Sequence, residues 1–101
     1  MRGIVMELIF KRQATVANTP IVMKFDVFAN VYLVKNLTDG DIYVSFGGGA
    51  SKEKRILIPE NCSQIISGLS GSQVQDPARG VVTIIPMTDS EKGVEVQCLE
   101  W

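Results

Sequence analysis

The chain has 101 residues, of which 46% are hydrophobic and 21% are charged, and its formal net charge is −1. This length and composition are typical of one globular domain, residues 1–101, that builds its core without disulfides or metals. The lack of a basic surplus removes the electrostatic argument for nucleic-acid binding, and no stretch approaches the roughly 20 apolar residues of a membrane span. The N-terminal stretch also lacks the pattern of a signal peptide, so we expect synthesis in the cytosol.

Two strands are expected before residue 30. The apolar run Ile4–Phe10, interrupted by Glu7, predicts a first strand with Lys11–Gln13 as its polar end. Pro20 breaks the chain, because proline fixes φ and cannot donate to a strand ladder. Ile21–Phe28 then alternates between apolar and polar positions over most of its length, which is the period of a strand that buries one face.

The segment Asn30–Phe46 contains two apolar runs on either side of the turn-forming residues Asn36–Asp41. In the second run, Ile42–Phe46, every other side chain is apolar, so one face can pack on a core. Gly40 is expected to take the positive φ that a tight turn requires. This arrangement predicts a β-hairpin.

The rest of the chain gives four further strand-like runs, at Lys54–Pro59, Cys62–Ser67, Val81–Pro86 and Val94–Leu99. Gly47–Ser51 is expected to form a flexible tip, and Asp89–Gly93 a turn. Gly68–Gly80 has no period and predicts a long loop, of the kind that often binds a ligand or orders as an arm in an oligomer. Short strands separated by turns, without a helical period, predict an all-β fold: a single antiparallel β-sandwich, jelly-roll-like, of about seven or eight short strands.

The residue types argue against enzymatic chemistry. The chain has no histidine, which excludes Ser-His and Cys-His nucleophile systems and imidazole metal sites. Its carboxylates form no recognisable catalytic pair. Cys62 and Cys98 can bridge two strands or remain as buried free thiols, and the second alternative is favoured. We expect no enzyme activity, no metal and no cofactor.

Four short segments partly match binding or modification motifs, but a flexible tip and a turn explain the first two better. Gly47–Lys52 lacks the Gly-Lys-Ser/Thr ending of a phosphate loop, and Asp39–Asp41 lacks the remaining ligands of an EF-hand. Asn36-Leu37-Thr38 and Asn61-Cys62-Ser63 match the glycosylation acceptor pattern, which means little without a secretory signal.

Tyr32, Tyr43 and Trp101 are the candidate interaction residues. Aromatic side chains on a sandwich surface can stack on sugars or anchor a partner protein, although they are more often buried or cover an edge. Trp101 stands out because an indole at a chain end is poorly held unless it docks on its own domain or on a neighbour.

The segments VYLVKNLTDGDIYVSF, RILIPENCSQIISG and VEVQCLEW resemble small structural proteins of tailed phages and prophages of Gram-positive bacteria. The resemblance covers residues 30–67 and 94–101, about half of the chain. It implies a virion component of head-fibre, decoration or tail-associated type, made in the bacterial cytoplasm and located in the virion. Its partners would be further copies of itself and other virion proteins. No site residues carry over, and residues 1–29, outside the resemblance, are either an arm or extra strands.

A carbohydrate- or host-surface-binding β-sandwich is the alternative function. The position of the aromatic residues separates the two hypotheses. If Tyr32, Tyr43 and Trp101 line one exposed face, glycan binding gains support. If they are buried or lie at a contact between subunits, the structural role gains support.

Overall fold

The computed structural model describes residues 9–25, 31–46, 55–67 and 80–100. Its elements are eight β-strands. In chain order these are β1 (Ile9–Thr15), β2 (Ile21–Lys24), β3 (Val31–Asn36), β4 (Ile42–Phe46), β5 (Ile56–Ile58), β6 (Ser63–Ile66), β7 (Val81–Pro86) and β8 (Ser90–Glu100).

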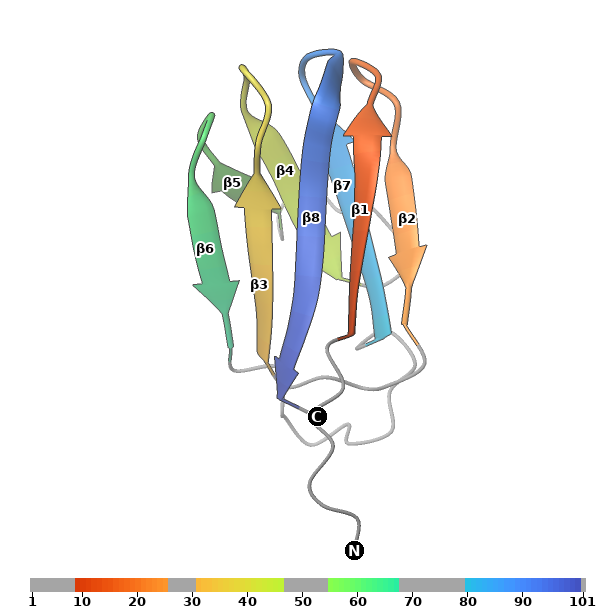
Figure 1. The fold of residues 1–101 in the computed structure, drawn as a ribbon, viewed down its shortest axis with the longest axis vertical. Helices are drawn as coiled ribbons and strands as arrows, with labels where there is room; N and C mark the ends of the chain where they lie inside the picture. The colour runs from red at the N-terminus through yellow and green to blue at the C-terminus, as the bar shows by residue number, and fades with distance from the viewer. Residues whose placement is uncertain (1–8, 26–30, 47–54, 68–79, 101) are drawn as a thin grey trace, which may run out of the picture.

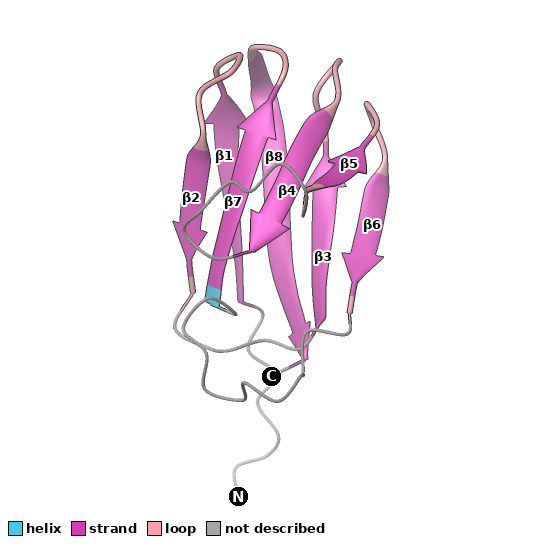
Figure 2. Cartoon of the chain, turned by 180° about the vertical axis from the view of Figure 1, so that it is seen from behind, coloured by secondary structure: helices cyan, strands magenta, loops and turns pink. Residues whose placement is uncertain are grey.

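The strands form two four-stranded sheets, in the orders β1-β8-β3-β6 and β2-β7-β4-β5. Figure 1 shows the first sheet in front, and Figure 2 shows the second from behind. All strand pairings are antiparallel, and β1 pairs with β8, β2 with β7, β3 with β6, and β4 with β5. The chain is therefore one long hairpin wrapped around two layers, which is the jelly-roll arrangement. The prediction of an antiparallel, jelly-roll-like β-sandwich is confirmed.

The core lies between the two sheets and follows from the two-residue period of the strands. Alternate residues of β3, β4, β7 and β8 point inward and are fully or almost fully buried. The inward-facing residues of β4 are those that the sequence pattern predicted, since Ile42 and Val44 are buried and Phe46 packs against the core. The fully buried apolar side chains are Tyr32, Val34, Ile42, Val44, Ile58, Val82, Ile84, Val94 and Val96.

The predicted hairpin at Asn30–Phe46 is wrong. β3 and β4 belong to different sheets, so the connection at residues 37–41 crosses from one layer to the other instead of joining two paired strands. Gly40 has no positive φ, whereas Gly93 does, at 65°. A Cβ at Gly40 would lie 2.6 Å from the Thr88 methyl carbon, so close packing against the neighbouring loop explains glycine there.

Asn36 holds this crossover connection in place. Its side-chain amide donates to the carbonyl oxygens of Gly40, Ile58 and Pro59 at 2.8, 3.0 and 3.0 Å. Its Oδ1 accepts hydrogen bonds from the backbone N–H and hydroxyl of Thr38. Asn36 is fully buried, so the first glycosylation acceptor pattern lies inside the folded domain.

β1 and β8 extend beyond their predicted bounds, whereas β2, β5 and β6 are shorter than predicted. β1 extends through the polar residues Lys11–Gln13 to Thr15, because an edge strand needs few buried side chains. β8 begins at Ser90, inside the predicted turn Asp89–Gly93, because Ser90 pairs with Thr15 beyond an irregularity in β1. Parts of other predictions lie outside the described residues, namely residues 4–8, 26–28, 47–51, 68–79 and Trp101.

Candidate interaction surfaces

Tyr32 lies in the core and is not available to a partner. Its exposed fraction is 0%, and its ring lies 5.7 Å from the Phe25 ring and 5.4 Å from the Phe46 ring, measured between centroids. Its inward direction follows from the alternation of β3, in which Tyr32, Val34 and Asn36 are all buried. Tyr32 is thus a packing residue that joins the two sheets.

Tyr43 lies on the outer face of the β2-β7-β4-β5 sheet and is half-buried. Its neighbours in register are Leu57 on β5 and Ile85 on β7. The Arg55 guanidinium carbon lies 5.5 Å from the centre of the Tyr43 ring, which is a cation–π contact. Tyr32 therefore lies between the two sheets, whereas Tyr43 lies on the outer face of one of them. Trp101 lies outside the described residues.

The outer face of the β1-β8-β3-β6 sheet carries apolar side chains on each of its four strands, with Gln97 of β8 between Phe10 and Leu33. Phe10 pairs with Gln97, Gln97 with Leu33, and Leu33 with Ile65. Phe10 is 47% exposed and Ile65 is 61% exposed, and nearby Leu99 on β8 is 43% exposed. We call Phe10, Leu33, Ile65 and Leu99 the apolar row. Large apolar side chains gathered on one exposed face are typical of an interaction surface.

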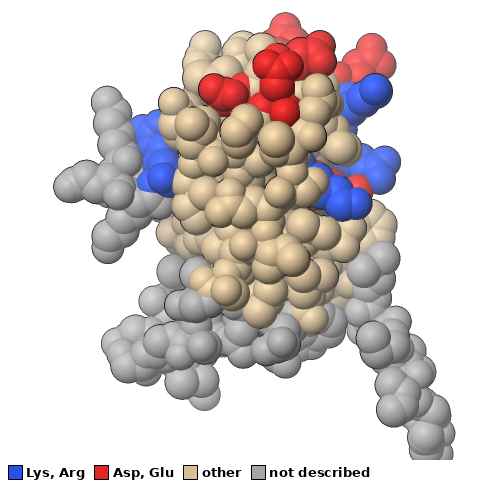
Figure 3. Space-filling model, turned by 90° about the vertical axis from the view of Figure 1, so that its left-hand side faces the viewer, with Lys and Arg blue, Asp and Glu red and all other residues tan. Residues whose placement is uncertain are grey.

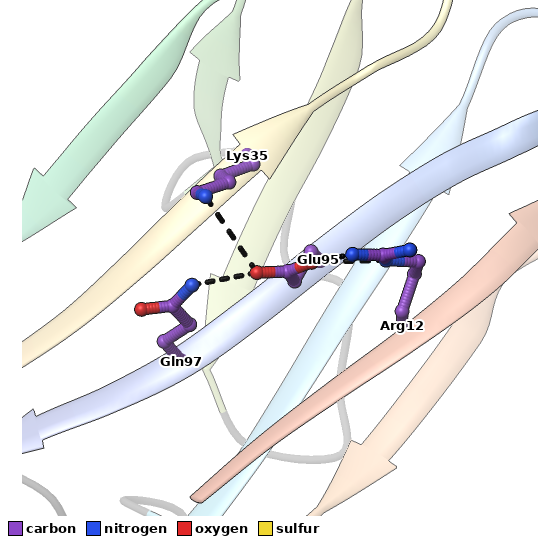
Figure 4. Close-up of polar contacts among 4 residues, drawn as sticks. All are labelled: Arg12, Lys35, Glu95 and Gln97. Atoms are coloured by element: carbon purple, nitrogen blue, oxygen red, sulfur yellow. Dashed lines mark hydrogen bonds and ion pairs between the residues drawn. The ribbon is translucent and has the colours of Figure 1, made fainter. Parts of the chain in front are cut away.

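A charged row borders the apolar row. Glu95 on β8 lies between Arg12 on β1 and Lys35 on β3 (Figure 4). Its Oε1 accepts hydrogen bonds from Arg12 Nε and Nη2 at 2.9 and 2.7 Å, and its Oε2 accepts one from the Gln97 amide at 2.6 Å. Lys35 Nζ lies 3.7 Å from Oε2. Glu95 is only 5% exposed, because these longer side chains cover it.

The surroundings of Glu95 keep it ionised. The hydrogen bond from Gln97 is the main cause that lowers the pKa of the Glu95 carboxyl from its ordinary value of 4.5, followed by the hydrogen bonds from Arg12. Burial acts in the opposite direction, and the positive charges of Arg12 and Lys35 add to the lowering. The charged row therefore joins β1, β8 and β3 on the outer face of the sheet.

Acidic side chains gather at one end of the sandwich, where the described loops β1–β2, β3–β4, β5–β6 and β7–β8 lie (Figures 1 and 3). An open hollow of about 630 Å³ at this end is lined by Ala14–Val16, Leu37, Asp39 and Asp89–Lys92. A second hollow, of about 480 Å³, opens between edge strands β1 and β2 and is lined by Lys11–Gln13 and Val22–Lys24. Among the described residues, the first hollow is lined by three carboxylates and one lysine, whereas the second is lined by three cationic side chains and no carboxylate.

The cysteines do not form a disulfide. Cys98 is buried, as expected for a thiol that behaves as a small hydrophobic residue, but Cys62 is exposed, which corrects the expectation for that residue. Burial raises the pKa of the Cys98 thiol to about 11. Among the described residues, no group of three His, Cys, Asp or Glu side chains is placed to hold a metal ion. The same part of the chain contains no helix with the length and hydropathy to cross a bilayer.

The fold defines the chain as a small jelly-roll β-sandwich with an exposed apolar row on one sheet. Comparisons with known proteins found no matching family model, no similar curated protein and no similar solved structure.

Sequence reasoning did not select the residues of the apolar row. A signal was present, because Ile65 and Ile66 are adjacent in a short strand, and adjacent residues point to opposite faces of a sheet. One of the two must face away from the core in a two-layer sandwich. The same signal was present at Phe10, because the adjacent Ile9 packs against the core and Phe10 points to the other face.

Proposed function

We propose that this chain is a non-enzymatic structural protein of a phage or prophage, which contributes to virion assembly through symmetric contacts between protein chains. The resemblance of its sequence segments to such proteins suggests the phage context. The fold is compatible with this role, since jelly rolls occur in viral capsid proteins, but they also occur in lectins, so fold alone does not decide function.

The apolar row is the observation that carries this proposal. It places exposed apolar side chains from β1, β6 and β8, and half-buried Leu33 from β3, on one sheet face, and this surface is unsuited to permanent contact with water. Most homo-oligomers bury such surfaces by closed symmetry. The covering partner in this proposal is another virion protein chain or a further copy of this one.

Binding of a carbohydrate or host surface has less support. Such a module would need an aromatic platform, and Tyr32 is buried in the core. Tyr43 is half-buried and its ring is in contact with the Arg55 guanidinium. The aromatic side chains in the described residues therefore do not share one exposed face.

Matched surface variants test the apolar row. Ile65→Lys adds a charge to the row from edge strand β6, and Leu57→Lys adds the same charge to edge strand β5 on the other sheet. We expect Ile65→Lys to weaken association at least tenfold in sedimentation-velocity experiments, because a charge must be desolvated in the contact. Leu57→Lys should behave as the unmodified chain does. Equal behaviour of the two variants would contradict the assignment of the contact to this face.

The virion role has a direct test. Particles purified after induction of the prophage that encodes the chain should contain it in a fixed ratio to the major structural proteins, as measured by quantitative mass spectrometry. Its absence from intact particles, with presence in the cell lysate, would contradict a structural role in the virion.

A further inference from the structure

The free edge of β1 is the starting point. β1 is the outermost strand of its sheet and, within the described residues, pairs only with β8. Five consecutive residues, Phe10–Ala14, are exposed, and the strand contains no proline. A strand edge with unpaired N–H and C=O groups is a template for pairing with another chain unless it is blocked.

β1 borders a cationic hollow along its middle and an acidic hollow at its C-terminal end. Residues 11–13 border the hollow that contains Lys11, Arg12 and Lys24, while residues 14–16 border the hollow that contains Asp39, Asp89 and Glu91. Both ion pairs in the described part of the chain involve Glu95, so Lys11, Lys24 and Glu91 have no intramolecular ion-pair partner there. The charge of the hollow that β1 borders therefore changes sign between Gln13 and Ala14.

We propose that β1 pairs antiparallel with β1 of a second copy of this chain, about a two-fold axis close to Gln13. An antiparallel two-fold pairing reverses one strand relative to the other, so the cationic residues of each β1 lie beside the acidic hollow of the other copy. The contact is self-complementary, and each favourable pair occurs twice. This inference rests on the proposed function, because it specifies one of the symmetric contacts.

The register centred on Gln13 also matches exposed apolar side chains. It places Phe10 of one copy near Val16 of the other, the residue that directly follows β1, and these residues are 47% and 60% exposed in the single chain. It places Lys11 opposite Thr15, which pairs with Ser90 next to Glu91. Lysine on an edge strand normally discourages pairing, but in this register Lys11 approaches the acidic hollow of the second copy. The pairing would join the two β1-β8-β3-β6 sheets into one continuous sheet.

A cysteine at the symmetry axis gives a direct test. Opposed residues in an antiparallel pair have Cα atoms about 4.5–5.5 Å apart, within the range that a disulfide spans. Gln13→Cys in a Cys62→Ser background should therefore give a disulfide-linked dimer under mild oxidation, seen by non-reducing electrophoresis. Gln64→Cys in the same background is the matched control, since Gln64 is exposed on β6, the opposite edge strand of the same sheet. Equal cross-linking at positions 13 and 64, or none at 13, would overturn the proposal.

A charge exchange tests the register independently of cysteine chemistry. Lys11→Glu and Glu91→Lys each place like charges opposite one another across the axis, so each should weaken dimerisation about tenfold or more. The double variant restores opposite charges and should recover most of the lost association. Circular dichroism confirms that each variant is folded, and additive losses in the double variant would contradict this register.

The outcomes separate this inference from the proposed function. If the oligomer is weakened by Ile65→Lys but Gln13→Cys gives no cross-linked dimer, the β1 pairing is contradicted and the proposed role in assembly is still supported. Recovery of the chain in purified particles without a β1-linked dimer would lead to the same conclusion. A chain that is monomeric at all concentrations and absent from particles would contradict both.

Discussion

At the scale of single residues, Glu95 is a carboxylate held by polar side chains from three neighbouring strands. A carboxylate on the outer face of a sheet is usually solvated, but this one accepts hydrogen bonds from Arg12 and Gln97 and lies near Lys35. Because its pKa is lowered on folding, the ionised form stabilises the native state. That stabilisation is complete above the ordinary pKa of 4.5 and is lost as the pH falls through the lower pKa of the folded protein.

Replacement of Glu95 by glutamine should remove this stabilisation. We expect Glu95→Gln to lower the free energy of unfolding by about 1–2 kcal/mol at pH 7, because it loses charge-assisted hydrogen bonds on a partly solvated surface. The difference from the unmodified chain should shrink at pH 3. Urea unfolding at both pH values measures the effect, with Glu60→Gln, an exposed carboxylate outside both ion pairs, as control. An equal difference at the two pH values would contradict the assigned role.

Asn36 is the residue whose chemistry is hardest to replace. Asn36→Asp keeps the shape of the side chain but exchanges a buried donor for an oxygen that faces the carbonyls of Gly40, Ile58 and Pro59. We expect a loss of about 3 kcal/mol in the free energy of unfolding at pH 7, measured by urea denaturation. Asn61→Asp makes the same change at an exposed position and should cost less than about 1 kcal/mol. Similar losses at both positions would show that the Asn36 network contributes little.

At the scale of elements, strand positions could be predicted more successfully than strand partners. β7 has the predicted bounds, Val81–Pro86, because apolar residues and a final proline mark it locally. The Asn30–Phe46 hairpin failed because the same local pattern fits a turn between paired strands and a crossover between sheets. Hydrogen bonds of the buried Asn36 side chain to Thr38 and to the Ile58 carbonyl stabilise the crossover. Asn36 and Ile58 are more than twenty residues apart in sequence, so the local pattern does not reveal this contact.

Gly93 fixes the position of β1 on β8. A Cβ at Gly93 would lie 1.8 Å from the backbone oxygen of Gln13, and its φ of 65° disfavours other residues. We expect Gly93→Ala to cost about 2 kcal/mol or more, because the backbone of β1 must shift. Gly40→Ala is the matched comparison, since there the added methyl meets only the Thr88 side chain, which can move. Thermal unfolding compares the two, and a larger loss for Gly40→Ala would contradict the role assigned to Gly93.

At the scale of the whole molecule, the surface of the sandwich has separate apolar, acidic and cationic regions. One sheet carries the apolar row and the charged row. The acidic hollow lies at one end of the sandwich, and the cationic hollow lies between edge strands β1 and β2. The sequence could predict the layered architecture, because strand period alone indicates two half-buried sheets. It could not predict these surfaces, because they combine residues from strands that are distant in the chain.

Molar mass in solution tests the central claim of assembly most directly. Multi-angle light scattering on the purified chain, over a tenfold range of concentration, should give a dimer or a larger closed oligomer. The reason is that the described residues leave the apolar row and the edge of β1 exposed in a single copy. The unmodified chain should keep this mass at the upper end of the range and lose it with Ile65→Lys. A mass of 11.1 kDa, that of one chain, at every concentration would contradict assembly through contacts between copies.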